Sequence, residues 1–173
     1  MAHSDLKPSM SAPPLSLTLA TGEPWSLSAT TPKALDLIAF YRGDFCPYCR
    51  DFIRSLEARA PQFQGRGIDL TAVSMDSPEL ARKSVTDWDL SAVKVACGLS
   101  LEMARAWRIF VTTRQAEASL VTFNEPALVF VAPDKTIYAM MLQSIPCGRP
   151  DLDNLLGGID FLAEHGYPTR GAH

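Results

Sequence analysis

The order of apolar segments along the chain constrains the fold more than any other feature. Residues 34–41 (ALDLIAFY) are apolar almost without a break, which is typical of a central strand covered on both faces. A helical pattern follows over residues 47–60, then a second strand over 68–75 and a helix over 77–85. Strand, helix and strand at this spacing predict parallel strands joined by right-handed crossovers. The first half of the chain therefore predicts an α/β domain.

The predicted helices have residues suited to their ends. Pro61 and Gly65 are expected to close the first helix, because neither residue favours a helix interior. Ser77 is suited to cap the second helix, and Pro78 fits its first position.

The second half of the chain predicts further elements of the same domain. These are a helix capped by Ser100 over 100–109, an antiparallel strand pair over 127–131 and 136–142, and a closing helix over 149–166. Two shorter strands are expected over 15–20 and 92–96. Residues 105–125 are longer than a minimal connection requires, and their aromatic side chains are equally compatible with contacts to a substrate, with the core, or with the face of a homodimer.

No internal repeat or linker divides the chain. We expect one domain over residues 15–168, preceded by a flexible arm over residues 1–14, which are rich in Ser and Pro. A chain of 173 residues with 47% hydrophobic and 20% charged residues is long and apolar enough to bury a substantial core.

Composition also argues against several partners and compartments. The net charge is −3 and no basic block stands out, so neither nucleic acid nor a membrane surface is an expected partner. The first twenty residues carry only Lys7 as a basic residue and have no apolar core before Pro13, which is unlike a signal peptide. No stretch reaches the roughly 18 apolar residues of a membrane span. Four cysteines are too few for a disulfide-stapled secreted scaffold, so a soluble, cytoplasmic protein is expected.

Cys46 and Cys49, in the segment FYRGDFCPYC, allow three interpretations: small buried side chains, half of a zinc site, or a redox pair. Structural zinc needs four protein ligands, and the other cysteines and histidines are scattered with no second pair, so no metal site is expected. Cys97 and Cys147 are better explained as small hydrophobic side chains.

The position of the pair favours redox chemistry. It follows a buried strand and begins a helix, with Pro47 suited to the first turn. Because unpaired N–H groups and the helix dipole stabilise a thiolate, Cys46 at the cap should be the more acidic and the more exposed thiol. Cys49, one turn further, should be buried on the same helical face and within disulfide reach.

Four neighbours of the pair are candidate supporting residues. Arg42 and Arg50 flank it and add positive potential, although each is also compatible with an ordinary solvated charge. Phe45 and Tyr48 would give the site an apolar rim.

The motif, inside a β-α-β unit, resembles the thioredoxin-like superfamily, and more closely its peroxiredoxin-like branch, the AhpC/TSA (redoxin) family. The resemblance covers about residues 13–165, and the later segment PALVFVAPDK strengthens it. It implies a thioredoxin-like fold with a mixed central sheet flanked by helices, no cofactor, and a thiol electron donor such as a thioredoxin or glutathione system. It also implies that Pro126 packs against the cysteine pair and follows a cis peptide bond.

Two departures from the family pattern leave the activity open. Typical peroxiredoxins carry Thr-x-x-Cys, so the resemblance aligns Cys49 with their peroxidatic cysteine and Cys46 with the threonine. The arginine that polarises peroxide in that pattern is replaced by Pro126. Typical thioredoxins instead have Trp before the first cysteine and a buried Asp six residues before it, where this chain has Phe45 and Phe40.

The main hypothesis is therefore an antioxidant thiol-disulfide oxidoreductase in which Cys46 attacks and Cys49 resolves, with a disulfide or a hydroperoxide as substrate. Cys46 is favoured as the attacking thiol because Pro126 stands in place of the peroxide-polarising arginine. The alternative is a thiol peroxidase with Cys49 as the peroxidatic cysteine. A hypothesis of another class is a non-catalytic thioredoxin-fold module that binds a partner and carries a structural disulfide.

Overall fold

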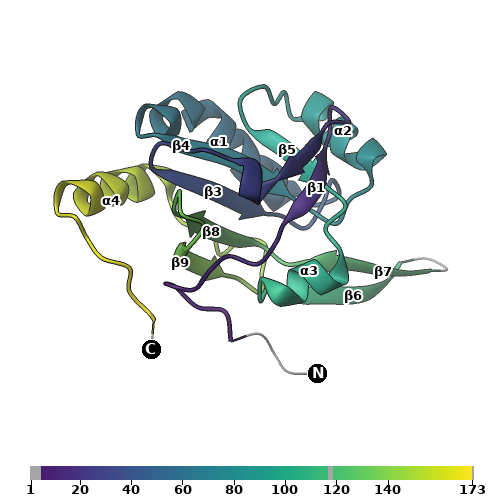
Figure 1. Cartoon of the computed structure of the whole chain (residues 1–173). Helices are drawn as coiled ribbons and strands as arrows, with labels where there is room; N and C mark the ends of the chain where they lie inside the picture. Colours follow the sequence, from purple (N-terminus) through teal and green to yellow (C-terminus); the bar gives the residue numbers. More distant parts are fainter. Residues whose placement is uncertain (1–4, 117–118, 173) are drawn as a thin grey trace.

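The computed structural model describes residues 5–116 and 119–172, and it has one central sheet with helices on both sides (Figure 1). The seven strands of this sheet run in the order β2-β1-β5-β4-β3-β8-β9. In chain order they are β1 (Ser16–Leu19), β2 (Pro24–Ser26), β3 (Leu35–Phe40), β4 (Ile68–Val73), β5 (Lys94–Cys97), β8 (Ala127–Val131) and β9 (Ile137–Leu142). The helices are α1 (Pro47–Gly65), α2 (Pro78–Asp87), α3 (Leu101–Ala106) and α4 (Leu152–Glu164).

The strand directions confirm the predicted mixed sheet. β3, β4 and β5 are parallel to one another, as the strand-helix-strand order predicts. β8 pairs antiparallel with β3 and also with β9, which confirms the predicted hairpin. The core strands expected over 34–41, 68–75 and 127–131 are therefore all present, with α1 packed on one face.

Each face of the sheet has its own hydrophobic core. Along β3, Leu37 and Ala39 point into the core beneath α1, α2 and α4, whereas Ile38 and Phe40 point into the core that α3 covers. All four side chains are buried, which explains why this strand is an uninterrupted apolar run. Among the described residues, no helix is both long and apolar enough to cross a bilayer.

The helix starts agree with the sequence signals, but α1 ends later than predicted. Ser77 and Ser100 accept hydrogen bonds from backbone N–H groups three residues on, as N-caps do. The prediction that Pro61 closes the first helix is wrong, because α1 continues to Gly65. A proline inside a helix costs about 3 kcal/mol. Phe63 lies in the last turn of α1 and is fully buried. Its packing in the core favours the longer helix, and the local sequence pattern around Pro61 does not reveal this.

The long connection over residues 105–125 contains a hairpin that the sequence did not predict. β6 (Val111–Ala116) and β7 (Ser119–Asn124) pair only with each other, and they extend away from the main sheet (Figure 1). Trp107 before the hairpin is fully buried in the core, and Phe123 is buried as well. Phe110 is half exposed, so the aromatic side chains of this segment do not share one role.

The N-terminal segment is more structured than a free arm would be. Ser9 N–H donates to the Ile137 carbonyl, Ala12 N–H donates to the Lys135 carbonyl, and Leu6 is buried. The described part of the expected arm, residues 5–14, is therefore attached along β9. The division at residue 15 stays a prediction.

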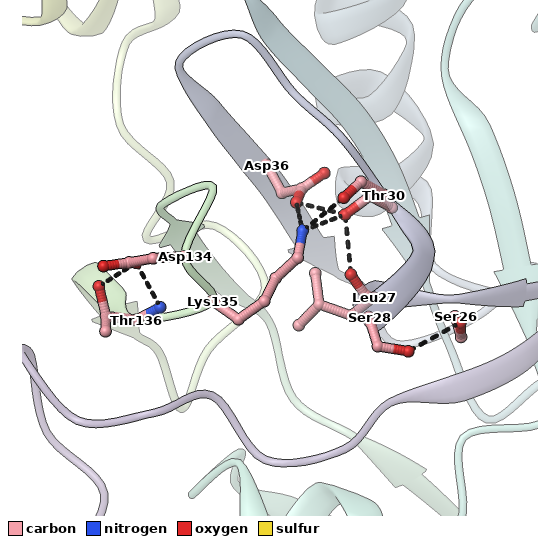
Figure 2. A network of polar contacts seen from close by, with 8 residues as sticks. All are labelled: Ser26, Leu27, Ser28, Thr30, Asp36, Asp134, Lys135 and Thr136. Carbon is pink, nitrogen blue, oxygen red and sulfur yellow. Dashed lines mark hydrogen bonds and ion pairs between the residues drawn. The ribbon is translucent and has the colours of Figure 1, made fainter.

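A partly buried ion pair connects the start of β3 to the turn between β8 and β9 (Figure 2). Lys135 Nζ lies 3.2 Å from Asp36 Oδ2 and 2.6 Å from Thr30 Oγ1. The Thr30 hydroxyl in turn donates to Asp36 Oδ2 at 2.6 Å. The Asp36 carboxylate is only 3% exposed, so its charge depends on these two partners.

Replacing Lys135 by methionine is expected to destabilise the protein by about 3 kcal/mol, because it leaves a buried carboxylate without its cation. Urea unfolding followed by circular dichroism measures the change in the free energy of unfolding. The exposed Lys33 gives a matched control, since Lys33→Met should shift that free energy by less than about 0.5 kcal/mol. Equal stability of the two variants would contradict the role given to the Lys135–Asp36 pair.

Candidate active site

The cysteine motif lies where β3 ends and α1 begins, as predicted. Cys46 is the N-cap of α1 and Pro47 is its first residue. Cys46 Sγ accepts a hydrogen bond from the backbone N–H of Cys49 at 3.3 Å, so a sulfur takes the place that a serine or aspartate oxygen has in most caps. The helix N-terminus thus presents its unpaired N–H groups to this sulfur.

Both thiols are buried and reduced. Cys46 is 2% exposed and Cys49 is fully buried, so Cys46 is the more exposed of the two, as predicted, although both are largely shielded from solvent. The neighbouring aromatic side chains of Phe45 and Tyr48 are exposed, at 44% and 58%. This agrees with the apolar rim expected from the sequence.

The two thiols differ strongly in acidity. A hydrogen bond from the Cys49 thiol is the main cause that lowers the pKa of Cys46 to about 6. The same hydrogen bond, together with burial, raises the pKa of Cys49 above its ordinary value. The two thiols therefore share a single negative charge near neutral pH, and Cys46 carries it in the resting state, as its cap position predicts.

The ultraviolet absorbance of the thiolate is expected to rise in one step centred near pH 6. Because the pKa of Cys46 is lowered, the thiolate is present above this pH and is lost as the pH falls below it. An ordinary cysteine would titrate near pH 8.5. The step should be absent from Cys46→Ser, and a wild-type protein that titrates only above about pH 8 would contradict the assignment.

Arg149 brings a guanidinium to the second sulfur from a loop far along the chain. Its Nη2 lies 3.5 Å from Cys49 Sγ, and its Cζ lies 4.3 Å from the centre of the Phe52 ring. The backbone N–H of Arg42 lies 3.5 Å from the same sulfur. Cys49 Sγ thus has two N–H donors. Burial lowers the pKa of Arg149 from its ordinary value, but an arginine keeps its charge in proteins.

The Arg149 guanidinium has free hydrogen-bonding capacity. Its Nε and Nη1 groups are buried and have no hydrogen-bond partner among the described residues. Sequence reasoning assigned no role to Arg149, because no spacing rule links a loop residue after the last strand to residue 49. In the sequence, Arg149 stands out only as an arginine between Gly148 and Pro150, which does not indicate a place in the active site.

Arg42, a predicted supporting residue, pairs with a carboxylate that the sequence did not single out. Arg42 Nε lies 3.5 Å from Glu125 Oε2, and Glu125 Oε1 accepts a hydrogen bond from the Thr112 hydroxyl at 2.6 Å. The Arg42 guanidinium also lies 4.6 Å from the centre of the Phe123 ring. Its positive charge contributes to the lowered pKa of Cys46.

Pro126 differs from the expectation in its peptide bond. The described part of the chain contains no cis peptide bond, so the predicted cis bond before Pro126 is wrong. Backbone hydrogen bonds are made by the residues on both sides of this peptide bond. The Glu125 N–H donates to the Phe110 carbonyl, and the Pro126 carbonyl accepts from the Gln143 N–H. The trans form is also the intrinsically preferred one, by about 0.5–1 kcal/mol. Pro126 is buried beside the end of β3, and its packing against the cysteine pair stays a prediction.

The hairpin contributes to the rim of the site. Phe123 of β7 packs edge-on against Phe45, with ring centroids 5.1 Å apart, and the Arg114 guanidinium of β6 lies 5.3 Å from the Phe45 ring centre. Arg50, the other flanking arginine, is exposed and donates from Nε to its neighbour Asp51.

The two remaining cysteines lie in different environments. Cys97 is buried, and its thiol donates to the Thr18 carbonyl at 3.3 Å. Burial raises the pKa of Cys97, which fits a small unreactive core residue. Cys147 is exposed, so the expectation that it is a buried side chain is wrong. It lies in the loop that carries Arg149.

Several solved structures that are similar to this chain are peroxiredoxins. Peroxidoxin BcpB from Mycobacterium tuberculosis is 14% identical with a TM-score of 0.74, covering 91% of this chain and 98% of its own. A yeast mitochondrial 1-Cys peroxiredoxin is 15% identical with a TM-score of 0.76, covering 93% and 79%. Peroxiredoxin Q from Xanthomonas campestris is 21% identical with a TM-score of 0.69, covering 86% and 91%. At these identities the likeness shows the fold, a thioredoxin-like peroxiredoxin fold.

The family is shown by the sequence itself. A search of curated proteins finds no match for the chain. The sequence profile of the AhpC/TSA family, however, matches residues 8–140, which include the cysteine motif, the parallel strands and most of the β8–β9 hairpin. This chain therefore belongs to the AhpC/TSA family.

Proposed function

We propose that the protein is a thiol-dependent peroxidase in which Cys49 attacks the peroxide and Cys46 resolves the product. The observation that carries the proposal is the Arg149 guanidinium, 3.5 Å from Cys49 Sγ with two further N–H groups unbonded. Donors at that position can hold a peroxide oxygen and stabilise the negative charge that develops as the O–O bond breaks. The sequence argument against a peroxidase was the proline at position 126, and Arg149 supplies a guanidinium from another loop.

The lowered pKa of Cys46 fits a role as proton acceptor in this reaction. At neutral pH the Cys46 thiolate accepts a hydrogen bond from the Cys49 thiol. As Cys49 Sγ attacks the peroxide, its proton moves to Cys46, and one peroxide oxygen is transferred to give a sulfenic acid on Cys49. The alkoxide or hydroxide that leaves takes a proton from Cys46, which restores the Cys46 thiolate.

The second half of the cycle uses the same two sulfurs. The Cys46 thiolate attacks Cys49 Sγ, an S–S bond forms, and the S–O bond breaks to release hydroxide, which takes a proton from solvent to give water. An external thiol donor then returns two electrons to the disulfide. A yeast relative with this fold is described as resolved by glutathione and thioredoxin systems, which suggests the class of donor here. A disulfide cycle of this kind needs no cofactor.

A disulfide reductase that attacks through Cys46 is the second candidate, and the lowered pKa of Cys46 favours it. Stopped-flow oxidation of the reduced protein, with hydrogen peroxide and a model disulfide tested side by side, separates the two. The proposal predicts a rate constant for peroxide far above that of a free thiol at the same pH. A protein that reacts with the disulfide but oxidises with peroxide no faster than free cysteine would favour the reductase.

A further inference from the structure

A surface pocket of about 390 Å³ lies beside the N-cap of α1. Phe45 and Pro47, the two neighbours of Cys46 in the chain, form the part of its wall nearest the cysteine pair. Its size is in the range of small-molecule sites. We propose that this pocket binds the reducing thiol, and that the thiol is a small peptide carrying both a carboxylate and an ammonium group. The inference rests on the proposed peroxidase cycle, because it concerns the step that regenerates the dithiol.

The walls of the pocket carry both signs of charge over an aromatic base. Lys83 lies 3.0 Å from carboxylate oxygens of Asp44 and Asp87, and the buried Trp88 lines the pocket as well. The Asp87 side chain is 51% exposed, so an ammonium group can reach its carboxylate. A ligand of a single charge sign would meet repulsion from one wall, whereas a zwitterion meets a partner on each side.

Arg50 is the cation best placed to hold a carboxylate. Its Nε donates to Asp51, and its two Nη groups make no hydrogen bond with the described residues. Its side chain is 47% exposed, so a ligand reaches it without displacing a buried pair. A guanidinium binds a carboxylate through two parallel hydrogen bonds, which orients the ligand as well as attracting it.

The location of the pocket fits attack on Cys46. Cys46 is 2% exposed whereas Cys49 is fully buried, so Cys46 is the more accessible of the two residues. The bound thiolate attacks Cys46 Sγ of the disulfide, the S–S bond breaks, and Cys49 leaves as a thiolate that is protonated. A second thiol molecule then attacks the bound peptide's sulfur, releases the oxidised peptide, and returns Cys46 as a thiolate.

The test follows re-reduction of the Cys46–Cys49 disulfide by Trp fluorescence in a stopped-flow instrument, with reduced glutathione as the zwitterionic probe and 2-mercaptoethanol as the uncharged one. The rate should saturate with glutathione and rise linearly with 2-mercaptoethanol. In Arg50→Gln, the ratio of the glutathione to the 2-mercaptoethanol rate constant should fall about tenfold, the loss expected for one charge-assisted contact.

Arg54→Gln is the matched control, because Arg54 is exposed one turn further along the same helix and does not line the pocket. Its ratio of rate constants should equal that of the wild type. A glutathione rate that stays linear throughout, an unchanged ratio in Arg50→Gln, or reduction by thioredoxin alone would overturn the proposal. The disulfide is formed with diamide, so the test remains decisive even if peroxide fails to oxidise the protein and the peroxidase function itself is wrong.

Discussion

Cys49→Ser is expected to lose oxidation by hydroperoxide by at least about a thousandfold, whereas Cys46→Ser still carries out the first oxidation step, more slowly, and stops at a sulfenic acid. The reason is that Cys49 Sγ is the sulfur with the Arg149 guanidinium beside it, while in the proposed cycle Cys46 accepts a proton and forms the disulfide. A serine at position 46 removes the thiolate base and the resolving sulfur, so the sulfenic acid on Cys49 should accumulate. A sulfenic-acid probe followed by peptide mass spectrometry locates the oxidised residue in each variant.

The same experiment has controls within the chain. Cys97→Ser and Cys147→Ser should oxidise at the wild-type rate, because the first thiol is bonded to a strand carbonyl and the second lies exposed in a loop. Cys46→Thr should also yield a sulfenic acid on Cys49, as the alignment with Thr-x-x-Cys predicts. Trapping of the sulfenic acid on Cys46 in Cys49→Ser, at an undiminished rate, would reverse the division of labour and support the reductase.

Arg149→Met is expected to lower the rate constant for oxidation by hydroperoxide about 10²- to 10³-fold, the usual effect of removing one donor to developing charge. Methionine keeps the length and much of the packing against Phe52, so the change isolates the guanidinium. Arg149→Lys should recover only part of the rate, because an ammonium keeps the charge but cannot offer the planar set of donors. Stopped-flow kinetics over a range of pH measure both effects.

A matched reaction separates polarisation of the peroxide from a general effect on the thiols. Alkylation by iodoacetamide breaks no O–O bond, so Arg149→Met should lower its rate much less than it lowers the peroxide rate. Arg54→Met, an exposed arginine on α1, should change neither rate. Equal losses in alkylation and peroxide reduction would mean that Arg149 acts only on the acidity of the thiols, and the role proposed for it would fail.

The parts of the site that were predictable lie within a few residues of one another. The apolar run over 34–41, the cysteine pair and Pro47 together define a strand end, a cap and a helix start, because each signal depends on local backbone geometry. The same local signals identified Ser77 and Ser100 as caps. The acidity of Cys46 also followed, since it depends on the first turn of its own helix.

The features of the site that the sequence did not predict, or predicted wrongly, depend on contacts between distant segments. The contact between Arg149 and Cys49 joins residues 100 positions apart, and the pairing of Arg42 with Glu125 crosses from the cysteine loop to the end of β7. The trans bond before Pro126 is accompanied by hydrogen bonds to Phe110 and Gln143, and neither partner is recognisable from the proline itself. A family pattern supplied the wrong isomer because it carries no information on these partners.

The sequence by itself determined the α/β class, parallel strands joined by helices, and a cysteine pair at a helix N-terminus, because hydrophobic period and capping act over short stretches of chain. Only the tertiary structure decided that both sulfurs are buried and which of them has an arginine beside it. Burial and guanidinium contacts depend on how loops meet at the end of the sheet. The lowered pKa of Cys46 has its main cause in Cys49, one turn along the same helix, whereas the arginine beside Cys49 comes from a loop 100 positions further along the chain.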